Sequence, residues 1–194
     1  MNSFTLYFQE GLAHILDFNG YDHILFVLAL CAVYTARDWP RVLILVTAFT
    51  IGHSVTLAMA TLGLVRYRTD VIEFLIPLTI FITALTNLVR RENPQPKSRL
   101  QLNYLLALFF GLIHGLGFSN YLRALLGKTQ SIVSPLFAFN IGLEVGQIII
   151  VAIFLVVAFI LTRYLRASTK IIRIGLSACI ACVALFLMWE RIFW

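Results

Sequence analysis

Histidine and acidic side chains inside long apolar runs are the residues of this sequence best suited to chemistry. Asp22 and His23 open the first such run, His53 lies in the second and His114 in the fourth. An ionisable side chain at the centre of a bilayer costs on the order of 3 kcal/mol, so a small membrane protein that keeps several is expected to use them. Imidazole together with carboxylate suits Ni, Co, Zn or Fe(II). The pattern predicts an intramembrane site for a divalent metal ion.

The predicted site has an inner set of ligands and an outer set of supporting polar residues. A carboxylate that holds a histidine ring is a common support of a metal site, so either Asp22 or His23 is expected to point at the metal. The alternative is that these groups only hydrogen-bond across helices and fix the bundle. The predicted ligands are His14, Asp22, His23, His53, His114 and Glu144, and the predicted supporting residues are Ser54, Glu73, Asn140 and Gln147.

The composition places the chain in a membrane and excludes a water-soluble globule. Of its 194 residues, 60% are hydrophobic and 12% are charged, against roughly 25% charged in a soluble domain. A net charge of +6 would suggest nucleic acid in a soluble protein, but the basic residues here lie in short segments between apolar runs. There they are topology signals, and we expect no nucleic-acid partner. The partner of the apolar surface is the lipid bilayer.

The length allows about six transmembrane helices at roughly 20 residues each. We expect an all-α polytopic membrane protein with one transmembrane domain, 1–194, and a short N-terminal interfacial helix before the first span. The Pro-rich stretch at 90–100 divides the spans three and three. The predicted spans are 20–36, 42–64, 71–89, 102–118, 132–162 and 171–193.

Basic residues also predict the orientation. Ten of the 15 Lys and Arg residues lie in the first, third and fifth loops, and basic loops are retained in the cytoplasm. Both termini are therefore expected to be extracytoplasmic, in the inner or plasma membrane of a bacterium. With this topology the ionisable residues gather toward the outer side, and the inner half offers a polar track of Thr83, Thr86 and Asn87 alone.

Two segments echo each other in the second and fifth predicted spans. Residues 49–55 read Phe-Thr-Ile-Gly-His-Ser-Val and residues 139–145 read Phe-Asn-Ile-Gly-Leu-Glu-Val. With three helices in each half, such a repeat would be inverted, as in transporters that build a site at the repeat interface. Four matching positions are also compatible with coincidence.

Four motifs spread over nearly the whole chain resemble the HupE/UreJ family of membrane proteins, in particular its second branch. The resemblance implies a protein that brings nickel, sometimes cobalt, into the cell, with partners in hydrogenase or urease maturation. In that family a His-x5-Asp-His motif of the first span supplies ligands, and here the stretch is His14-x7-Asp22-His23, two residues longer. The motifs are Gly11-Leu-Ala-His14 with Gly20-Tyr-Asp22-His23-Ile-Leu-Phe26, Phe49-Thr-Ile-Gly-His53-Ser-Val-Thr56-Leu57, Phe110-Gly111-Leu-Ile-His114-Gly115-Leu-Gly117-Phe118, and Phe139-Asn140-Ile-Gly142-Leu-Glu144-Val-Gly146-Gln147.

Three functions remain open at this point. The leading hypothesis is a nickel- or cobalt-type permease that binds its ion through Asp22 or His23 together with His53, His114 and Glu144. The second is a metal-dependent intramembrane hydrolase or transferase, in which the ion activates water at the outer leaflet, because the ligand set would look the same. The third is a non-catalytic accessory protein. The sequence alone decides neither between Ni, Co and Zn nor between enzyme and transporter.

Overall fold

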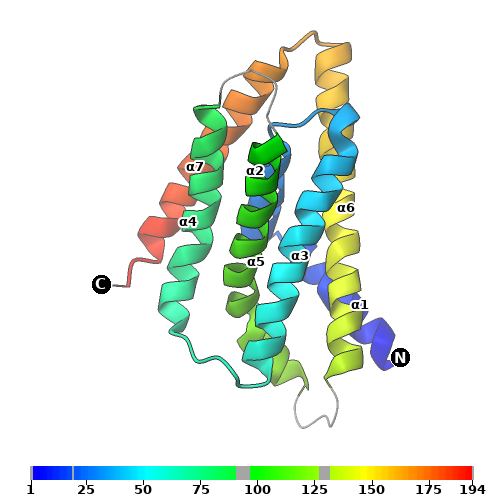
Figure 1. Ribbon diagram of the computed structural model, residues 1–194, viewed down its shortest axis with the longest axis vertical. Coiled ribbons are helices and arrows are strands. Elements are labelled where there is room, and N and C mark those ends of the chain that lie inside the picture. Colours follow the sequence, from blue (N-terminus) through cyan, green and yellow to red (C-terminus); the bar gives the residue numbers. More distant parts are fainter. Residues whose placement is uncertain (1, 19, 91–96, 127–131, 194) are drawn as a thin grey trace.

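The computed structural model describes residues 2–18, 20–90, 97–126 and 132–193, and within these ranges the chain is helical, as predicted (Figure 1). Hydrophobic side chains fill the space between the helices, with Phe26, Phe49 and Phe139 fully buried. The described helices are α1 (Ser3–Leu16), α2 (Asp22–Cys31), the 3-10 helix η1 (Ala36–Asp38), α3 (Trp39–Thr61), α4 (Thr69–Leu88), α5 (Lys97–Leu126), α6 (Val133–Arg163) and α7 (Thr169–Glu190).

The number of spanning helices differs from the prediction of six. Among the described residues five helices, α3 to α7, are long and apolar enough to cross a membrane. The first predicted span, 20–36, contains instead the ten-residue helix α2, which covers about 15 Å of a hydrocarbon core about 30 Å thick. Its apolar run is interrupted because Thr35 and Asp38 form a capping box that starts η1. Hydropathy could not separate that turn from the helix before it.

Helix α1 packs lengthwise against α6 at backbone contact distance. A Cβ on Gly11 would collide with the carbonyl oxygen of Phe139, and a Cβ on Gly142 would collide with the carbonyl oxygen of Phe8. Glycine on both helices permits this close approach, as in other membrane helix pairs. The helix predicted to lie at the interface is therefore part of the bundle.

Helices α3 and α5 form a second pair of the same kind. A Cβ on Gly52 would collide with the carbonyl oxygen of Leu108, and a Cβ on Gly111 would collide with that of Phe49. The two helices of each pair are parallel, but α6 runs upward in Figure 1 whereas α3 and α5 run downward. The two pairs thus have opposite directions.

Each close pair joins one helix from the first half of the chain to one from the second half. Helices α1 and α3 precede the predicted division at 90–100, and α5 and α6 follow it. Residues 91–96 of that division lie outside the described residues. The remaining long helices, α4 and α7, pack against each other along one flank of the bundle (Figure 1).

Candidate metal centre

Three histidines from three helices meet inside the bundle. His14 of α1, His23 of α2 and His53 of α3 each offer a ligand atom, and these atoms lie within 4.8 Å of one another. The ring centroids are 4.5 Å apart for His14 and His23, 5.8 Å for His23 and His53, and 5.9 Å for His14 and His53. We call these residues the three-histidine group.

The helix boundaries explain why these residues meet. His14 lies in the last turn of α1, and the chain then leaves the helix at Asp17 and starts α2 at Asp22. The break between the two helices allows the ring of His23 to meet that of His14 edge-on. His53 follows Gly52, the residue at which α3 approaches the backbone of α5. The longer spacing between His14 and Asp22 therefore does not remove His14 from the predicted site.

Several ring nitrogens of the group have no hydrogen-bond partner among the described residues. They are both nitrogens of His53 and the Nε2 atoms of His14 and His23. His53 is fully buried and His23 is 7% exposed. Buried polar atoms are normally hydrogen-bonded, so an unpartnered cluster needs an explanation. A metal ion binds the unprotonated nitrogen of a neutral imidazole, whose lone pair is not used in a hydrogen bond.

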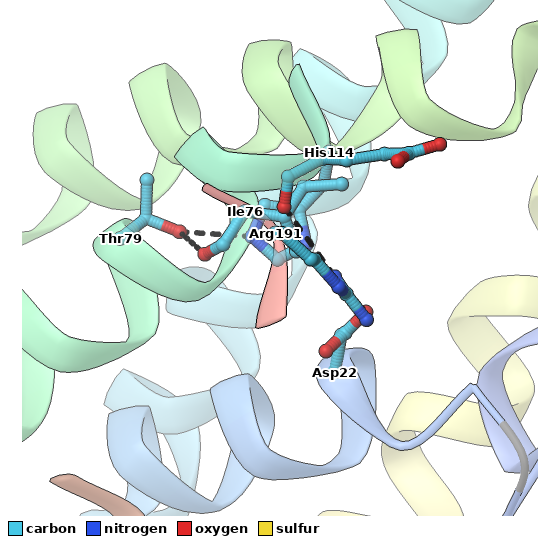
Figure 2. Close-up of polar contacts among 6 residues, drawn as sticks. Asp22, Ile76, Thr79, His114 and Arg191 are labelled. Atoms are coloured by element: carbon cyan, nitrogen blue, oxygen red, sulfur yellow. Dashed lines mark hydrogen bonds and ion pairs between the residues drawn. The ribbon is translucent and has the colours of Figure 1, made fainter. Parts of the chain in front are cut away.

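His114 lies beside this group, held by Thr79 of α4. Its ring centroid is 5.1 Å from that of His23, and its Nε2 is 2.9 Å from the Thr79 hydroxyl. That hydroxyl donates its single proton to the carbonyl oxygen of Ile76 at 2.7 Å, so it accepts from His114 (Figure 2). In the neutral ring the proton is then on Nε2, and the buried Nδ1 keeps a lone pair with no described partner. His114 is thus prepared as a further nitrogen ligand without belonging to the group.

Asp22 is paired with a cation rather than grouped with the histidines. Its Oδ2 lies 3.0 Å from Nη1 of Arg191, beyond the end of α7 (Figure 2). Arg191 also donates to the backbone carbonyl of Glu73, at 3.4 Å. The Glu73 side chain itself is exposed. Of the adjacent pair at the start of α2, the structure therefore brings His23 into the group and directs Asp22 to Arg191.

The other predicted residues lie between α3 and α6 or along α3. Glu144 accepts a hydrogen bond from the Thr47 hydroxyl at 2.7 Å, and Gln147 accepts one from Thr50 at 2.8 Å. Ser54 donates to the carbonyl of Thr50 in its own helix. The Oδ1 atom of Asn140 is buried without a described partner. Glu144 is not among the residues whose ligand atoms converge with the three-histidine group.

Phenylalanine rings enclose the histidines. Phe118 lies against His14 with ring centroids 3.7 Å apart, and Phe26 and Phe49 lie 5.0 Å and 5.1 Å from His114. These phenylalanines belong to the four motifs described in the sequence, but no role was predicted for them. Phe49 lies one turn before His53 and Phe118 one turn after His114, so helical spacing could have placed them beside the site. Apolar rings packed around the histidines lower the local dielectric constant.

Thr79 is the second kind of residue that the sequence analysis missed. It precedes Thr83 by four residues, so it extends the polar track of Thr83, Thr86 and Asn87 by one turn along one face of α4. The hydroxyl of Thr83 donates to the carbonyl of Thr79, and Asn87 donates to the carbonyl of Ala29 in α2. The helical period was the signal that could have found it.

A cavity of about 410 Å³ opens along this track, on the side of the histidines away from the α3–α4 connection. Its polar wall includes Thr83, Thr86, Asn87 and Asn103. Phe110, which lies one turn before His114, also lines it. A cavity with polar side chains on part of its wall therefore begins within one or two helical turns of the histidines.

A family model described as HupE / UreJ protein matches residues 1–191, and this match confirms the resemblance noted from the motifs. No curated protein and no solved structure gives a significant match.

Proposed function

Because the chain belongs to the HupE/UreJ family, we propose that it is a membrane permease for a divalent ion of the nickel or cobalt type. The observation that carries the proposal is the three-histidine group, whose ligand atoms lie within 4.8 Å of one another. Imidazole nitrogen is a donor that Ni, Co and Zn accept readily. His14, His23 and His53 would bind the ion, and His114, whose ring is 5.1 Å from that of His23, would support the site from beside the group.

The neutral character of this ligand set favours transit over storage. Three imidazoles leave the charge of a divalent ion uncompensated, and Asp22, the nearest carboxylate along the chain, is already paired with Arg191. An uncompensated charge is costly in a dry site. Conduction requires a site that binds well enough for entry but weakly enough for release. Water, a counter-anion or the move into a polar compartment would lower the cost of leaving.

The cavity beside α4, part of whose wall is the polar face of this helix, supports an exit route. Hydrogen bonds link His114 to Thr79 and Thr79 to Thr83, and Thr83 lines the cavity. Phe26 lies between the histidines and this compartment, with its ring 5.0 Å from His114 and 6.0 Å from Phe110. The orientation predicted from the basic loops puts the cavity at the cytoplasmic end. The proposed direction is therefore inward, toward metalloenzyme-maturation partners in a bacterial cytoplasm.

Uptake into liposomes tests the proposal. The purified protein is reconstituted into vesicles that contain a nickel- or cobalt-sensitive dye, and influx is compared with that of His53→Ala. Gly175→Ala is the matched control, because a Cβ at this position would meet no atom within 4 Å. We expect influx with the wild type and the control and none with His53→Ala. Influx equal to that of empty vesicles in all three samples would contradict transport.

A metal-dependent hydrolase or transferase is the second candidate, and the same group favours it. Three histidines with one open position are a known ligand set of catalytic zinc. In such an enzyme the ion would lower the pKa of a bound water and supply a nucleophile. Hydrolysis of an ester or peptide in a zinc-loaded sample, lost in His53→Ala and accompanied by no metal influx, would favour this candidate over the permease.

A further inference from the structure

A second cavity, remote from the three-histidine group, lies where four parts of the chain meet. Its volume is about 690 Å³. It is lined by the segment 32–37 after α2, by Arg90 after α4, by the last turns of α6 and by the first turn of α7. These parts meet at the upper end of the bundle in Figure 1, the end that carries the predicted cytoplasmic loops.

The lining of this cavity is strongly basic. Arg37, Arg90, Lys170 and Arg173 all contribute, and none of the lining residues is acidic. The ion pairs among the described residues involve none of Arg37, Lys170 and Arg173. Arg90 lies over the ring of Tyr34, 5.8 Å from its centroid. Basic side chains gathered around one space, with no acidic residue in its lining, favour the binding of an anion.

Arg173 is the strongest sign of a ligand. It is 9% exposed, and its Nε atom is buried with no hydrogen-bond partner in the described part of the chain. A buried guanidinium is costly unless it is paired, and its planar donors match a phosphate group. Arg173 lies in the first turns of α7, whose N-terminal end also favours negative charge. Thr169 lines the same space, and its hydroxyl can donate to a phosphate oxygen.

Part of the lining is apolar and consists of Phe154 and Phe159 of α6 and Ile172 of α7. A free phosphate has no use for such a wall, whereas an acyl chain can pack on it. Basic pockets between transmembrane helices are known to bind the headgroups of anionic lipids.

We propose that this cavity binds a phosphate-bearing anion, the headgroup of an anionic phospholipid, between the four basic side chains. The bound headgroup would join the α2–α3 connection to the start of α7. The lining contains no member of the three-histidine group, but Val33, Tyr34 and Arg90 also line the cavity beside α4. The test below therefore measures lipid retention and uses no transport readout.

Native mass spectrometry of the purified full chain tests the proposal. The protein is titrated separately with phosphatidylglycerol, with phosphatidylcholine and with inorganic phosphate. Lys170→Gln and Arg173→Gln each remove one cation from the cavity, and Arg163→Gln removes an exposed cation at the end of α6 that does not line it. Lys170 is exposed, so its variant is expected to fold even if Arg173→Gln does not.

We expect the wild type and Arg163→Gln to retain phosphatidylglycerol in preference to phosphatidylcholine. Each cavity variant should weaken this binding about fivefold, the effect of one basic residue on an anionic headgroup. Retention of inorganic phosphate alone, with the same loss in the variants, would assign the site to free phosphate instead of lipid. Equal retention of both lipids by the wild type, or unchanged binding in Lys170→Gln, would overturn the proposal.

Discussion

The helix pairs α1–α6 and α3–α5 are built on the same contact. Gly11 and Gly111 each begin a Gly-Leu-x-His sequence, and each presses against the backbone carbonyl of a phenylalanine, Phe139 in one pair and Phe49 in the other. That phenylalanine begins a Phe-x-Ile-Gly sequence, and the glycine of this sequence packs against the helix that carries the Gly-Leu-x-His sequence. Since the pairs run in opposite directions, these contacts give physical support to the predicted inverted repeat.

The pairs differ in what they add to this shared contact. In α3 the residue after the glycine is His53, and in α6 it is the fully buried Leu143. His14 and His114 occupy equivalent places, but His114 is hydrogen-bonded to Thr79 whereas Nε2 of His14 has no described partner. The third histidine, His23, comes from the short helix α2. The scaffold is repeated, but the ligand set takes one histidine from each pair and one from α2.

Breaking the shared contact should have the largest effect. Gly11→Ala and Gly111→Ala each put a Cβ into a neighbouring backbone carbonyl, and overpacking that only backbone movement can relieve costs about 3 kcal/mol or more. We expect a large fall in the unfolding temperature in detergent. Gly175→Ala, in open space, should be neutral or slightly stabilising. A Gly111→Ala protein as stable as Gly175→Ala would show that the pairs are not in backbone contact.

Metal-binding measurements can distinguish the role of His53 in α3 from that of His114 in α5. His53→Ala removes a member of the three-histidine group, so the affinity for Ni²⁺ or Co²⁺ should become too weak to measure. His114→Ala removes a neighbour of the group, and its loss should weaken binding about 10- to 100-fold, as for supporting residues of metal sites. Isothermal titration calorimetry measures both. Equal losses would mean that His114 is a full ligand.

The hydrogen bond that distinguishes His114 from His14 predicts a smaller effect. Thr79→Val removes the acceptor of the His114 Nε2–H and leaves that group unpaired, which should cost about 1 to 2 kcal/mol of stability. Thr83→Val is the control, because the Thr83 hydroxyl donates to a carbonyl of its own helix. Chemical denaturation should give a clearly larger loss for Thr79→Val, and a loss no larger than that of the control would argue against this bond.

The smallest effect concerns the glycine one turn after the shared contact. In the α1–α6 pair this glycine lies on α6, and in the α3–α5 pair it lies on α5. Gly146 of α6 accommodates the buried Ile15, whereas Gly115 of α5 accommodates Thr56 of α3. Ile15→Val should leave a small cavity over Gly146 and lower the free energy of unfolding by about 1 kcal/mol. Ile44→Val, on the exposed side of α3, should change it less. Equal effects would indicate that Ile15 does not fill this space.

Most of the long helices could be predicted from the sequence, because apolar runs between basic loops reflect the bilayer directly. The count of six is not confirmed at α2, since hydropathy reads the turn at Ala32–Thr35 as a continuation of this short helix. The packing of α1 on α6 was missed for a different reason. The glycines of this helix pair contact residues more than 100 positions away along the chain. A single sequence does not indicate which of its distant segments lie next to each other.

The candidate site was predictable in its residue types and less so in its members. The rarity of ionisable residues in apolar runs pointed to all four histidines, and three of them converge. Their partners were not predictable, because Asp22 pairs with Arg191 and Glu144 bonds to Thr47 through contacts between distant helices. Adjacent residues on a helix diverge by about 100°, so either Asp22 or His23 could have faced the ion. Whether the converging nitrogens bind metal stays a prediction.

Equilibrium metal binding to the purified protein tests the central claim most directly. The account predicts that the wild type binds a single Ni²⁺ or Co²⁺ ion, and that His14→Ala, His23→Ala and His53→Ala each abolish this binding. Glu144→Gln, which alters a carboxylate outside the group, should retain it. A wild type that binds no divalent metal, or three histidine variants that bind as well as Glu144→Gln, would contradict the account.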